Sequence, residues 1–327
     1  MLIYVKGYRV YSQKRIIKLL VIIAGVQLSL FIGYYFYDDV ITNINNRSFS
    51  CQKVTSEQST THLPRSKTLD EVNVELVTKK ETINEPKELL KDKLRHIAPT
   101  NKDDIVEINS KRVEPILYTN SIPLASLSIP QKKQKFIDMM IPSILVAKHQ
   151  MRLDKERVAS LIIKNDITIK DEEWLREKRK EFQALDNYEL HDKMESHPTS
   201  IVIAQAIIES GWGTSKFFQK ANNVFGVWSF DKNDNRIAAS KKRGKKTIYL
   251  KKYKSMEESI YDYFVTLARK DCYKNFQRKR LLIEDPYKLV NYLMKYSERG
   301  ESYTKDLKKM IRQNRLSAYD GYQLDLK

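Results

Sequence analysis

The chain has 327 residues, of which 59 are Lys or Arg and 41 are Asp or Glu, so its formal net charge is +18. This charge predicts a polyanionic partner, and nucleic acid, anionic lipid and anionic cell-wall polymer all qualify. Two cysteines and five histidines lack the CxxC and HExxH spacings of zinc sites. We therefore expect no metal ion and no cofactor. A disulfide between Cys51 and Cys272 would require an oxidising compartment.

Residues 19–37 form an uncharged, apolar stretch that is long enough to span a bilayer as a helix. Residues 1–18 contain five Lys or Arg and no acid, whereas Asp38 and Asp39 follow the stretch. This asymmetry predicts a basic cytoplasmic N-terminus and a single-pass anchor in the inner (cytoplasmic) membrane, with the C-terminal domain in the periplasm or extracytoplasmic space. A cleaved signal peptide is disfavoured, because no small-residue cleavage pattern follows the apolar core.

Residues 38–130 have the composition of a flexible linker. They are rich in Thr, Ser, Asn, Lys and Glu, and their only aromatic residues are Phe49 and Tyr118. Such a segment buries too little apolar surface to offset the entropy of ordering it. We expect a tether with a reach on the order of 50 Å, which would let an anchored domain search a nearby layer.

Residues 131–327 carry the periodicity of a folded, mainly helical domain. Apolar residues recur at helical spacing in several segments, among them 201–209, 255–269, 286–295 and 301–314. Between Val224 and Tyr253 the residues become β-prone and alternating, which predicts a small β-hairpin lobe. The expected fold class is mainly α (α+β).

Glu209 ends an apolar helix that begins near Pro198 and stops at Gly211. A carboxyl group there faces the negative end of the helix dipole and apolar neighbours, and both influences raise its pKa. A glycosidase acid needs this property, because it must hold a proton near neutral pH. Without further context, the pattern favours a solvated glutamate at the helix end over a catalytic acid.

The segment HPTSIVIAQAIIESGWGTSKFFQKANNVFGVW (197–228) closely resembles the core motif of bacterial peptidoglycan glucosaminidases, AQAxxESGWGxS followed by NNxFG. FQRKR (276–280) and YSERGESYTKDLKKMIRQNRL (296–316) resemble the Bax-like subgroup. The resemblance covers about residues 131–320. It implies a lysozyme-like helical domain with a cleft beside a small β lobe, and hydrolysis of β-1,4 bonds in peptidoglycan glycan strands by an endo-β-N-acetylglucosaminidase.

By motif match, the resemblance implies that Glu209 is the catalytic acid. Aromatic rings can stack on sugar rings, and amides can bind hydroxyl and acetamido groups. Packing of the lobe junction or a turn explains the same residue types. The residues that would bind substrate are Ser210, Trp212, Asn222, Asn223, Phe225 and Trp228.

A second catalytic carboxylate is not evident, because residues 235–256 contain no acid. Asp231 and Glu298 are candidates, although a turn explains Asp231 and an ion pair with Arg299 explains Glu298. Alternatively, the acetamido group of the substrate acts as the nucleophile, with Tyr261 or Tyr263 orienting it. We expect substrate assistance rather than a carboxylate pair.

Other functions are compatible with parts of this pattern. A muramidase or a lytic transglycosylase would use the same fold, and a non-catalytic wall-binding module would explain the missing acid. The basic stretch 241–254 fits anionic wall polymer, the membrane surface or an ordinary solvated face. An exported domain would rarely meet nucleic acid, so we expect no such partner. The sequence does not predict an oligomeric state.

Overall fold

The computed structural model describes residue 90, residues 92–239 and residues 247–327. The predicted N-terminal segment 1–18 and anchor 19–37, most of the predicted linker, and Cys51 lie outside these ranges. Within them, no helix has both the length and the apolar character that crossing a membrane requires. The anchor therefore stays a prediction.

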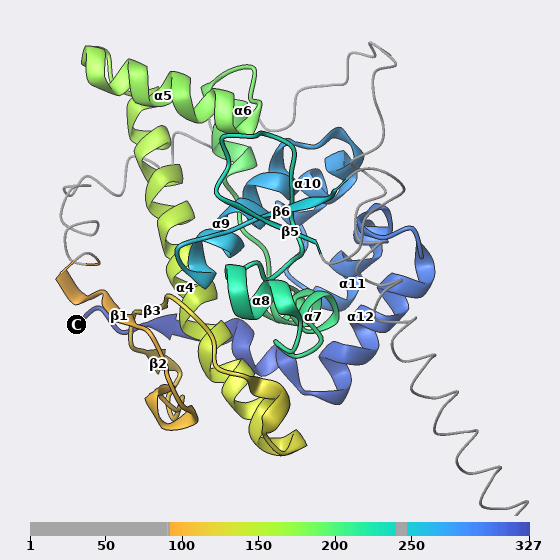
Figure 1. The fold of residues 1–327 in the computed structure, drawn as a ribbon. Coiled ribbons are helices and arrows are strands. Elements are labelled where there is room, and N and C mark those ends of the chain that lie inside the picture. Colours follow the sequence, from red (N-terminus) through yellow and green to blue (C-terminus); the bar gives the residue numbers. More distant parts are fainter. Residues whose placement is uncertain (1–89, 91, 240–246) are drawn as a thin grey trace, which may run out of the picture. The chain divides into compact units, whose positions relative to one another are not determined.

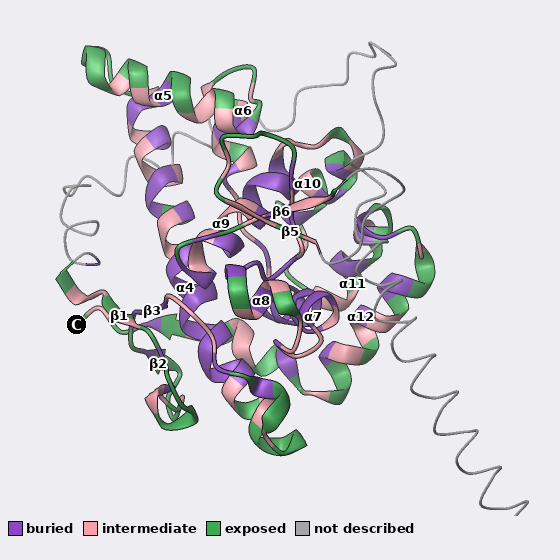
Figure 2. Ribbon diagram, in the orientation of Figure 1, coloured by how far each residue is buried: buried purple, intermediate pink, exposed green. Residues whose placement is uncertain are grey.

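Helix α4 (Ile129–Ile162) is the central element of the domain (Figure 1). It packs against α9 (Met256–Arg269), α7 (Thr199–Ser210) and α6 (Asn187–Lys193). Buried residues follow one another along its middle from Phe136 to Ala147, as the purple stretch of α4 in Figure 2 illustrates. The other helices of the described residues are α5 (Ile169–Phe182), α8 (Lys216–Ala221), α10 (Lys274–Arg280), α11 (Pro286–Leu289) and α12 (Glu301–Gln313). Short 3-10 helices lie at Lys102–Asp104, Leu124–Ser126, Asp271–Tyr273 (η4), Val290–Tyr296 (η5) and Leu316–Gly321 (η6).

Helix α7 is apolar on all sides and almost wholly buried, as expected of a helix enclosed by others. Its N-terminus is capped from a distant segment, because the N–H and hydroxyl of Ser200 donate to Asp320 at 2.7 and 2.8 Å. At its C-terminus Gly211 adopts φ +59°, a left-handed conformation that glycine adopts without steric cost. The predicted start and stop of this helix are confirmed.

The predicted small β lobe is also confirmed. Its antiparallel sheet has the strand order β4 (Trp228–Ser229), β6 (Tyr249–Lys251), β5 (Arg236–Ala238). Trp228 pairs with Leu250, and Arg236 pairs with Lys251. Together with the helices, this sheet gives the mainly α fold that the sequence predicts.

The predicted linker 38–130 extends too far, because residues 92–130 are part of the folded domain. Strand β1 (Arg95–Ile97) pairs in parallel with β3 (Ile116–Tyr118), and β2 (Arg112–Val113) pairs with β7 (Gln323–Leu324) near the C-terminus. These elements add to the core of the helical domain rather than forming one of their own. The buried side chains that they and their neighbours contribute are Ile105, Val113, Ile116, Leu117, Tyr118, Ile122 and Leu124.

Candidate active site

Glu209 lies in the last turn of α7, where its side chain is enclosed by the domain and the residue is only 6% exposed. Its Oε1 accepts a hydrogen bond from the hydroxyl of Tyr303, at 3.1 Å. Tyr303 belongs to α12, so the C-terminal part of the chain positions this carboxyl group. The Glu209 that the sequence predicts as an acid is therefore a buried group with a defined donor.

Four buried tyrosines lie within the electrostatic influence of this carboxyl group. Tyr263 comes from α9, Tyr273 from η4, Tyr296 from η5 and Tyr303 from α12. Tyr296 stacks on Tyr303, with ring centroids 5.5 Å apart. Burial raises the pKa of each tyrosine, and the negative charge of Glu209 raises it further. All four hydroxyls therefore stay protonated and available as donors.

A line of hydrogen bonds continues from Tyr303 into the core. Nε2 of Gln205 donates to the Tyr303 hydroxyl at 3.1 Å, and the Tyr263 hydroxyl donates to Oε1 of Gln205 at 2.5 Å. Behind Tyr263, Nε2 of His197 lies 2.9 Å from its hydroxyl. None of His197, Gln205 and Tyr303 is among the site residues predicted from the sequence. The sequence did contain one signal for this network. Gln205 is a polar residue in an apolar helix, and it lies one helical turn before Glu209 and therefore on the same face.

His197 gives this network a pH-dependent stability. Burial lowers the pKa of His197 well below 6.5, and the positive charges of Arg280 and Lys148 lower it further. The native ring is therefore neutral, whereas the unfolded ring takes up a proton as the pH falls below about 6.5. The free energy of unfolding should then fall by up to about 1.4 kcal/mol per pH unit between 6.5 and the lower native pKa, and be unaffected by this group above 6.5.

Urea unfolding at pH 7.5, 6.5, 5.5 and 5.0 measures this loss. His197→Gln keeps an N–H within reach of Tyr263 but does not titrate, so the difference between the two proteins isolates the histidine. Parallel stability curves for the two proteins over this range would contradict the assignment.

The turn after Glu209 has an unusual backbone. Gly211, Trp212 and Gly213 all have positive φ, at 59°, 59° and 72°. The Trp212 ring packs edge-on against Phe136 of α4, with centroids 5.6 Å apart, and Nζ of Lys133 lies 4.9 Å from the centre of the Trp212 ring. Trp212 therefore joins this turn to α4.

Three of the predicted substrate-binding residues form hydrogen bonds to backbone groups with their polar side-chain atoms. The Ser210 hydroxyl donates to the Ala206 carbonyl at 2.6 Å and accepts from the Gly213 N–H at 2.9 Å. Nδ2 of Asn222 donates to three carbonyl oxygens, those of Thr119, Tyr253 and Lys254. Asn223 bonds to both backbone groups of Val227 and to the Lys251 carbonyl. These hydrogen bonds fix the backbone of the segment 210–227, which includes helix α8.

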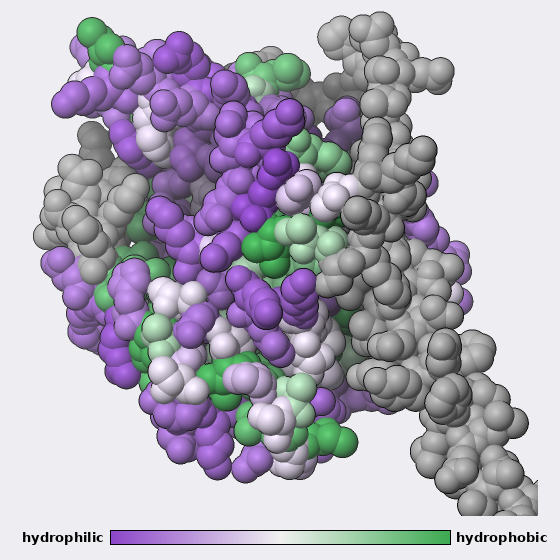
Figure 3. Space-filling view, in the orientation of Figure 1, coloured by the Kyte–Doolittle hydropathy of each residue, from purple (hydrophilic) through white to green (hydrophobic). Residues whose placement is uncertain are grey.

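The aromatic candidates differ in exposure. Phe225 is buried and stacks on Tyr263, with centroids 4.1 Å apart and an interplanar angle of 15°. Trp228 is half-buried on β4, and its ring lies 6.1 Å from that of Phe230. Phe230 itself is 72% exposed, on a molecule whose surface is mainly hydrophilic in the view of Figure 3. Phe230 is an aromatic candidate that the sequence analysis did not single out.

Three of the four candidates for a second catalytic or supporting group lie outside the hydrogen-bond network of Glu209. Asp231 is exposed, and its Oδ1 accepts from the Asn233 N–H in a turn, at 2.9 Å. Glu298 is also exposed, and Arg299 pairs with Asp306 instead of Glu298. The Tyr261 hydroxyl contacts Lys178 and Asp154, at 2.9 and 3.2 Å. Of the four candidates, only Tyr263 joins the network that leads to Glu209.

Residues 185–316 match the family model of glucosaminidases, described as mannosyl-glycoprotein endo-beta-N-acetylglucosaminidase. Over 131 residues, 38% of this chain, the sequence is 30% identical to Protein bax of Escherichia coli (strain K12). Over 145 residues, 42% of this chain, it is 31% identical to Exo-glucosaminidase LytG of Bacillus subtilis (strain 168). The catalytic domain of the autolysin Auto from Listeria monocytogenes aligns with 20% identity over 51% of this chain and 97% of that domain, with a TM-score of 0.32.

These matches confirm the glucosaminidase and Bax-like resemblance of the sequence motifs. The similarity covers 46% of Protein bax and 51% of LytG, so the chain matches about half the length of each relative. Glu209, Gln205 and all four tyrosines of the cluster lie within residues 185–316.

Proposed function

We propose that this protein hydrolyses β-1,4 glycosidic bonds in peptidoglycan glycan strands, with Glu209 as the general acid. The observation that carries the proposal is the buried Glu209 carboxyl group among four protonated tyrosines, inside the segment that matches the glucosaminidase family model. A protonated Glu209 would donate its proton to the leaving glycosidic oxygen. Tyr303 would then stabilise the carboxylate that remains, because its hydroxyl donates to Oε1.

Substrate assistance fits this site better than a pair of carboxylates. In that mechanism the acetamido oxygen bonds to the anomeric carbon while the glycosidic bond breaks, and water later opens the ring that has formed. The acetamido group needs a hydrogen-bonding partner. No hydrogen bond within the described residues occupies the hydroxyls of Tyr273 and Tyr296, and both tyrosines lie within the electrostatic influence of Glu209. These two hydroxyls are our candidates to orient the acetamido group.

The position of cleavage is part of the proposal. The description of the family model favours an endo-acting N-acetylglucosaminidase, whereas LytG is named an exo-glucosaminidase. Mass spectrometry of digested sacculi distinguishes these modes, since an endo enzyme releases a range of oligomers and an exo enzyme releases single end units. Reducing N-acetylglucosamine ends support the proposal. Anhydro-muramyl ends would identify a lytic transglycosylase, and the absence of any product would indicate a binding module.

We further propose that residues 19–37 anchor the protein in the inner membrane, with the catalytic domain on the outer side. The uncharged stretch and the one-sided basic flank support this arrangement. Membrane fractionation followed by protease treatment of spheroplasts tests it. The domain should sediment with membranes and be digested from outside; recovery in the soluble cytoplasmic fraction would refute the anchor.

The exposed Phe230, with the half-buried Trp228 beside it, is a candidate platform for a sugar ring. Phe230→Ala should raise the substrate concentration for half-maximal activity by about 3- to 10-fold and leave kcat nearly unchanged, because stacking of this kind contributes about 0.5–1.5 kcal/mol to binding. Steady-state rates on soluble glycan oligomers measure both constants. Phe230→Tyr is the matched control and should bind as the wild type does. A fall in kcat with an unchanged KM would argue against a binding role.

A further inference from the structure

The hydrogen bonds between His197 and Glu209 have a single direction. A tyrosine hydroxyl has one proton, and an amide group donates only through its nitrogen. Tyr263 gives its proton to Oε1 of Gln205, at 2.5 Å, so Nε2–H of His197 is the donor to Tyr263. Nε2 of Gln205 donates to Tyr303, which leaves the Tyr303 proton for Glu209. Every donation therefore runs toward Glu209.

The orientation of the Gln205 amide decides which group receives the Tyr303 proton. If this amide rotated by half a turn, Oε1 would face Tyr303 and attract its single proton. Glu209 would then lose the hydrogen bond from Tyr303. As long as Nε2–H of His197 donates to Tyr263, this rotation is opposed, because the single proton of the Tyr263 hydroxyl then has to go to Oε1 of Gln205.

Water cannot take over these contacts, since His197, Gln205, Tyr263 and Tyr303 are between 0% and 4% exposed. In such surroundings an unsatisfied polar atom is costly, so the arrangement in which every link is made is strongly favoured. The network also joins three helices, because Gln205 lies on α7, Tyr263 on α9 and Tyr303 on α12.

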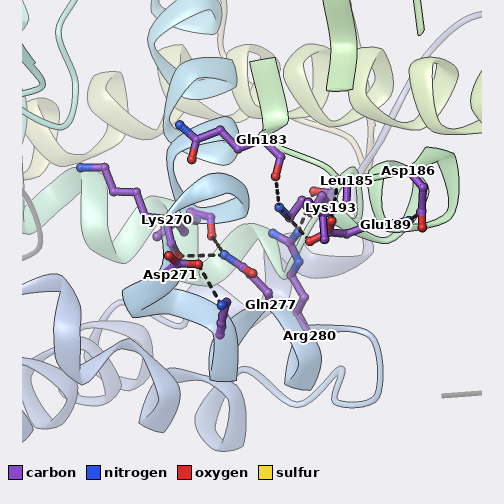
Figure 4. Close-up of polar contacts among 11 residues, drawn as sticks. Gln183, Leu185, Asp186, Glu189, Lys193, Lys270, Asp271, Gln277 and Arg280 are labelled. Carbon is purple, nitrogen blue, oxygen red and sulfur yellow. Dashed lines mark hydrogen bonds and ion pairs between the residues drawn. The ribbon is translucent and has the colours of Figure 1, made fainter. Parts of the chain in front are cut away.

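At the end of the network away from Glu209, His197 packs against aromatic rings and lies within the electrostatic influence of a buried cation. His197 makes edge-on contacts with Phe264 and Phe276, at 5.1 and 5.2 Å between centroids. Arg280, only 5% exposed, is held by a hydrogen bond from Nη2 to the Lys193 carbonyl, at 2.7 Å (Figure 4). Its positive charge disfavours a second proton on His197. Phe276 and Arg280 are the first and last residues of the FQRKR motif. This motif therefore contributes to the surroundings of His197.

We propose that His197, Tyr263 and Gln205 are positioning residues that direct the Tyr303 hydroxyl onto Glu209 by fixing the orientation of the Gln205 amide. The inference rests on the proposed function of Glu209. None of the three touches the reacting atoms, and each acts through the next residue in the line. The relevant chemical effect is on the carboxylate that remains after Glu209 has given up its proton, because only this charged form gains a full charge-assisted hydrogen bond.

Tyr263→Phe in the full-length chain tests the relay, with Tyr261→Phe as the matched control. Both tyrosines lie on α9 and both hydroxyls are hydrogen-bonded, but Tyr261 contacts Lys178 and Asp154. Tyr263→Phe should lower kcat about tenfold with little change in KM. It should also move the alkaline limb of the kcat–pH profile upward by about one unit, because a carboxylate with one donor fewer holds its proton to higher pH. Tyr261→Phe should change neither quantity.

His197→Gln should restore most of the activity that His197→Phe loses, because only the glutamine offers an N–H to Tyr263. An unchanged alkaline limb in Tyr263→Phe would overturn the proposal, as would an equal shift in Tyr261→Phe. A further readout needs no activity: the ¹⁵N shifts of the His197 ring should report an Nε2–H tautomer, and an Nδ1–H tautomer would overturn the relay. A wild-type protein without hydrolytic activity would count against the proposed function, and the ring shifts would still decide the relay.

Discussion

Replacing Glu209 with Gln is expected to lower the rate of peptidoglycan hydrolysis by about 10²- to 10⁴-fold, the usual contribution of a general acid. The amide keeps the shape of the side chain, and its oxygen can still accept from the Tyr303 hydroxyl. The variant should therefore fold as the wild type does. Zymograms on purified sacculi, with release of soluble fragments followed by mass spectrometry, measure the loss; circular dichroism and thermal unfolding verify the fold.

Glu298→Gln is the matched control for this experiment. It makes the same chemical change at an exposed glutamate, the one that the sequence singled out as a possible second acid. We expect activity close to that of the wild type. An equal loss in both variants would support a two-carboxylate mechanism, whereas full activity in Glu209→Gln would rule out Glu209 as the acid.

The sequence was sufficient to predict α7 and its terminal acid because the signals are local. A run of apolar residues interrupted only by Gln205 predicts a buried helix, and Gly211 supplies the left-handed residue that ends it. The network behind Glu209 could not be predicted in this way. Gln205 and Tyr303 are 98 residues apart, and His197 and Tyr263 are 66 apart, so no local pattern links them. Only the packing of α7 against α9 and α12 brings these side chains together.

The predicted linker shows what the average composition of a segment fails to predict. Averaged over residues 38–130, the sequence is polar, but the triplet Ile116–Tyr118 is wholly buried. A short apolar segment cannot fold alone, yet it adds favourably to a core that others have built. Composition predicts whether a segment can form its own core, and it says nothing about docking onto another one.

Asn222 has structural contacts besides the substrate contacts that motif similarity predicts for it. Asn222 was matched as a substrate ligand, yet its amide bridges three backbone carbonyls, one of them at Thr119 outside the matched family segment. Asn222 also adopts a left-handed conformation, with φ 49°, which asparagine tolerates better than most residues. A motif residue near an active site can therefore be required by the loop rather than by the substrate.

Gly213→Ala is expected to destabilise the domain by about 3 kcal/mol. Gly213 has φ +72°, where an L-residue with a side chain costs about 1–2 kcal/mol more than glycine. A Cβ atom there would also lie 2.6 Å from Cδ1 of Leu124, 2.9 Å from Cε1 of Phe218 and 3.0 Å from Cδ2 of Phe136. These three side chains are themselves fully buried, so they cannot move aside without disturbing the core. Urea unfolding at pH 7.5 measures the change.

Gly226→Ala separates the backbone cost from the crowding. Gly226 has nearly the same φ, +66°, but no atom lies within 4 Å of the position of a Cβ. Its substitution should therefore cost about 1 kcal/mol, the backbone strain alone. A much larger loss of unfolding free energy in Gly213→Ala than in Gly226→Ala would mean that Leu124, Phe136 and Phe218 pack tightly against the turn that follows Glu209. Equal losses would mean that backbone strain alone explains both glycines, and that the segment around Leu124 contributes little to the shape of this turn.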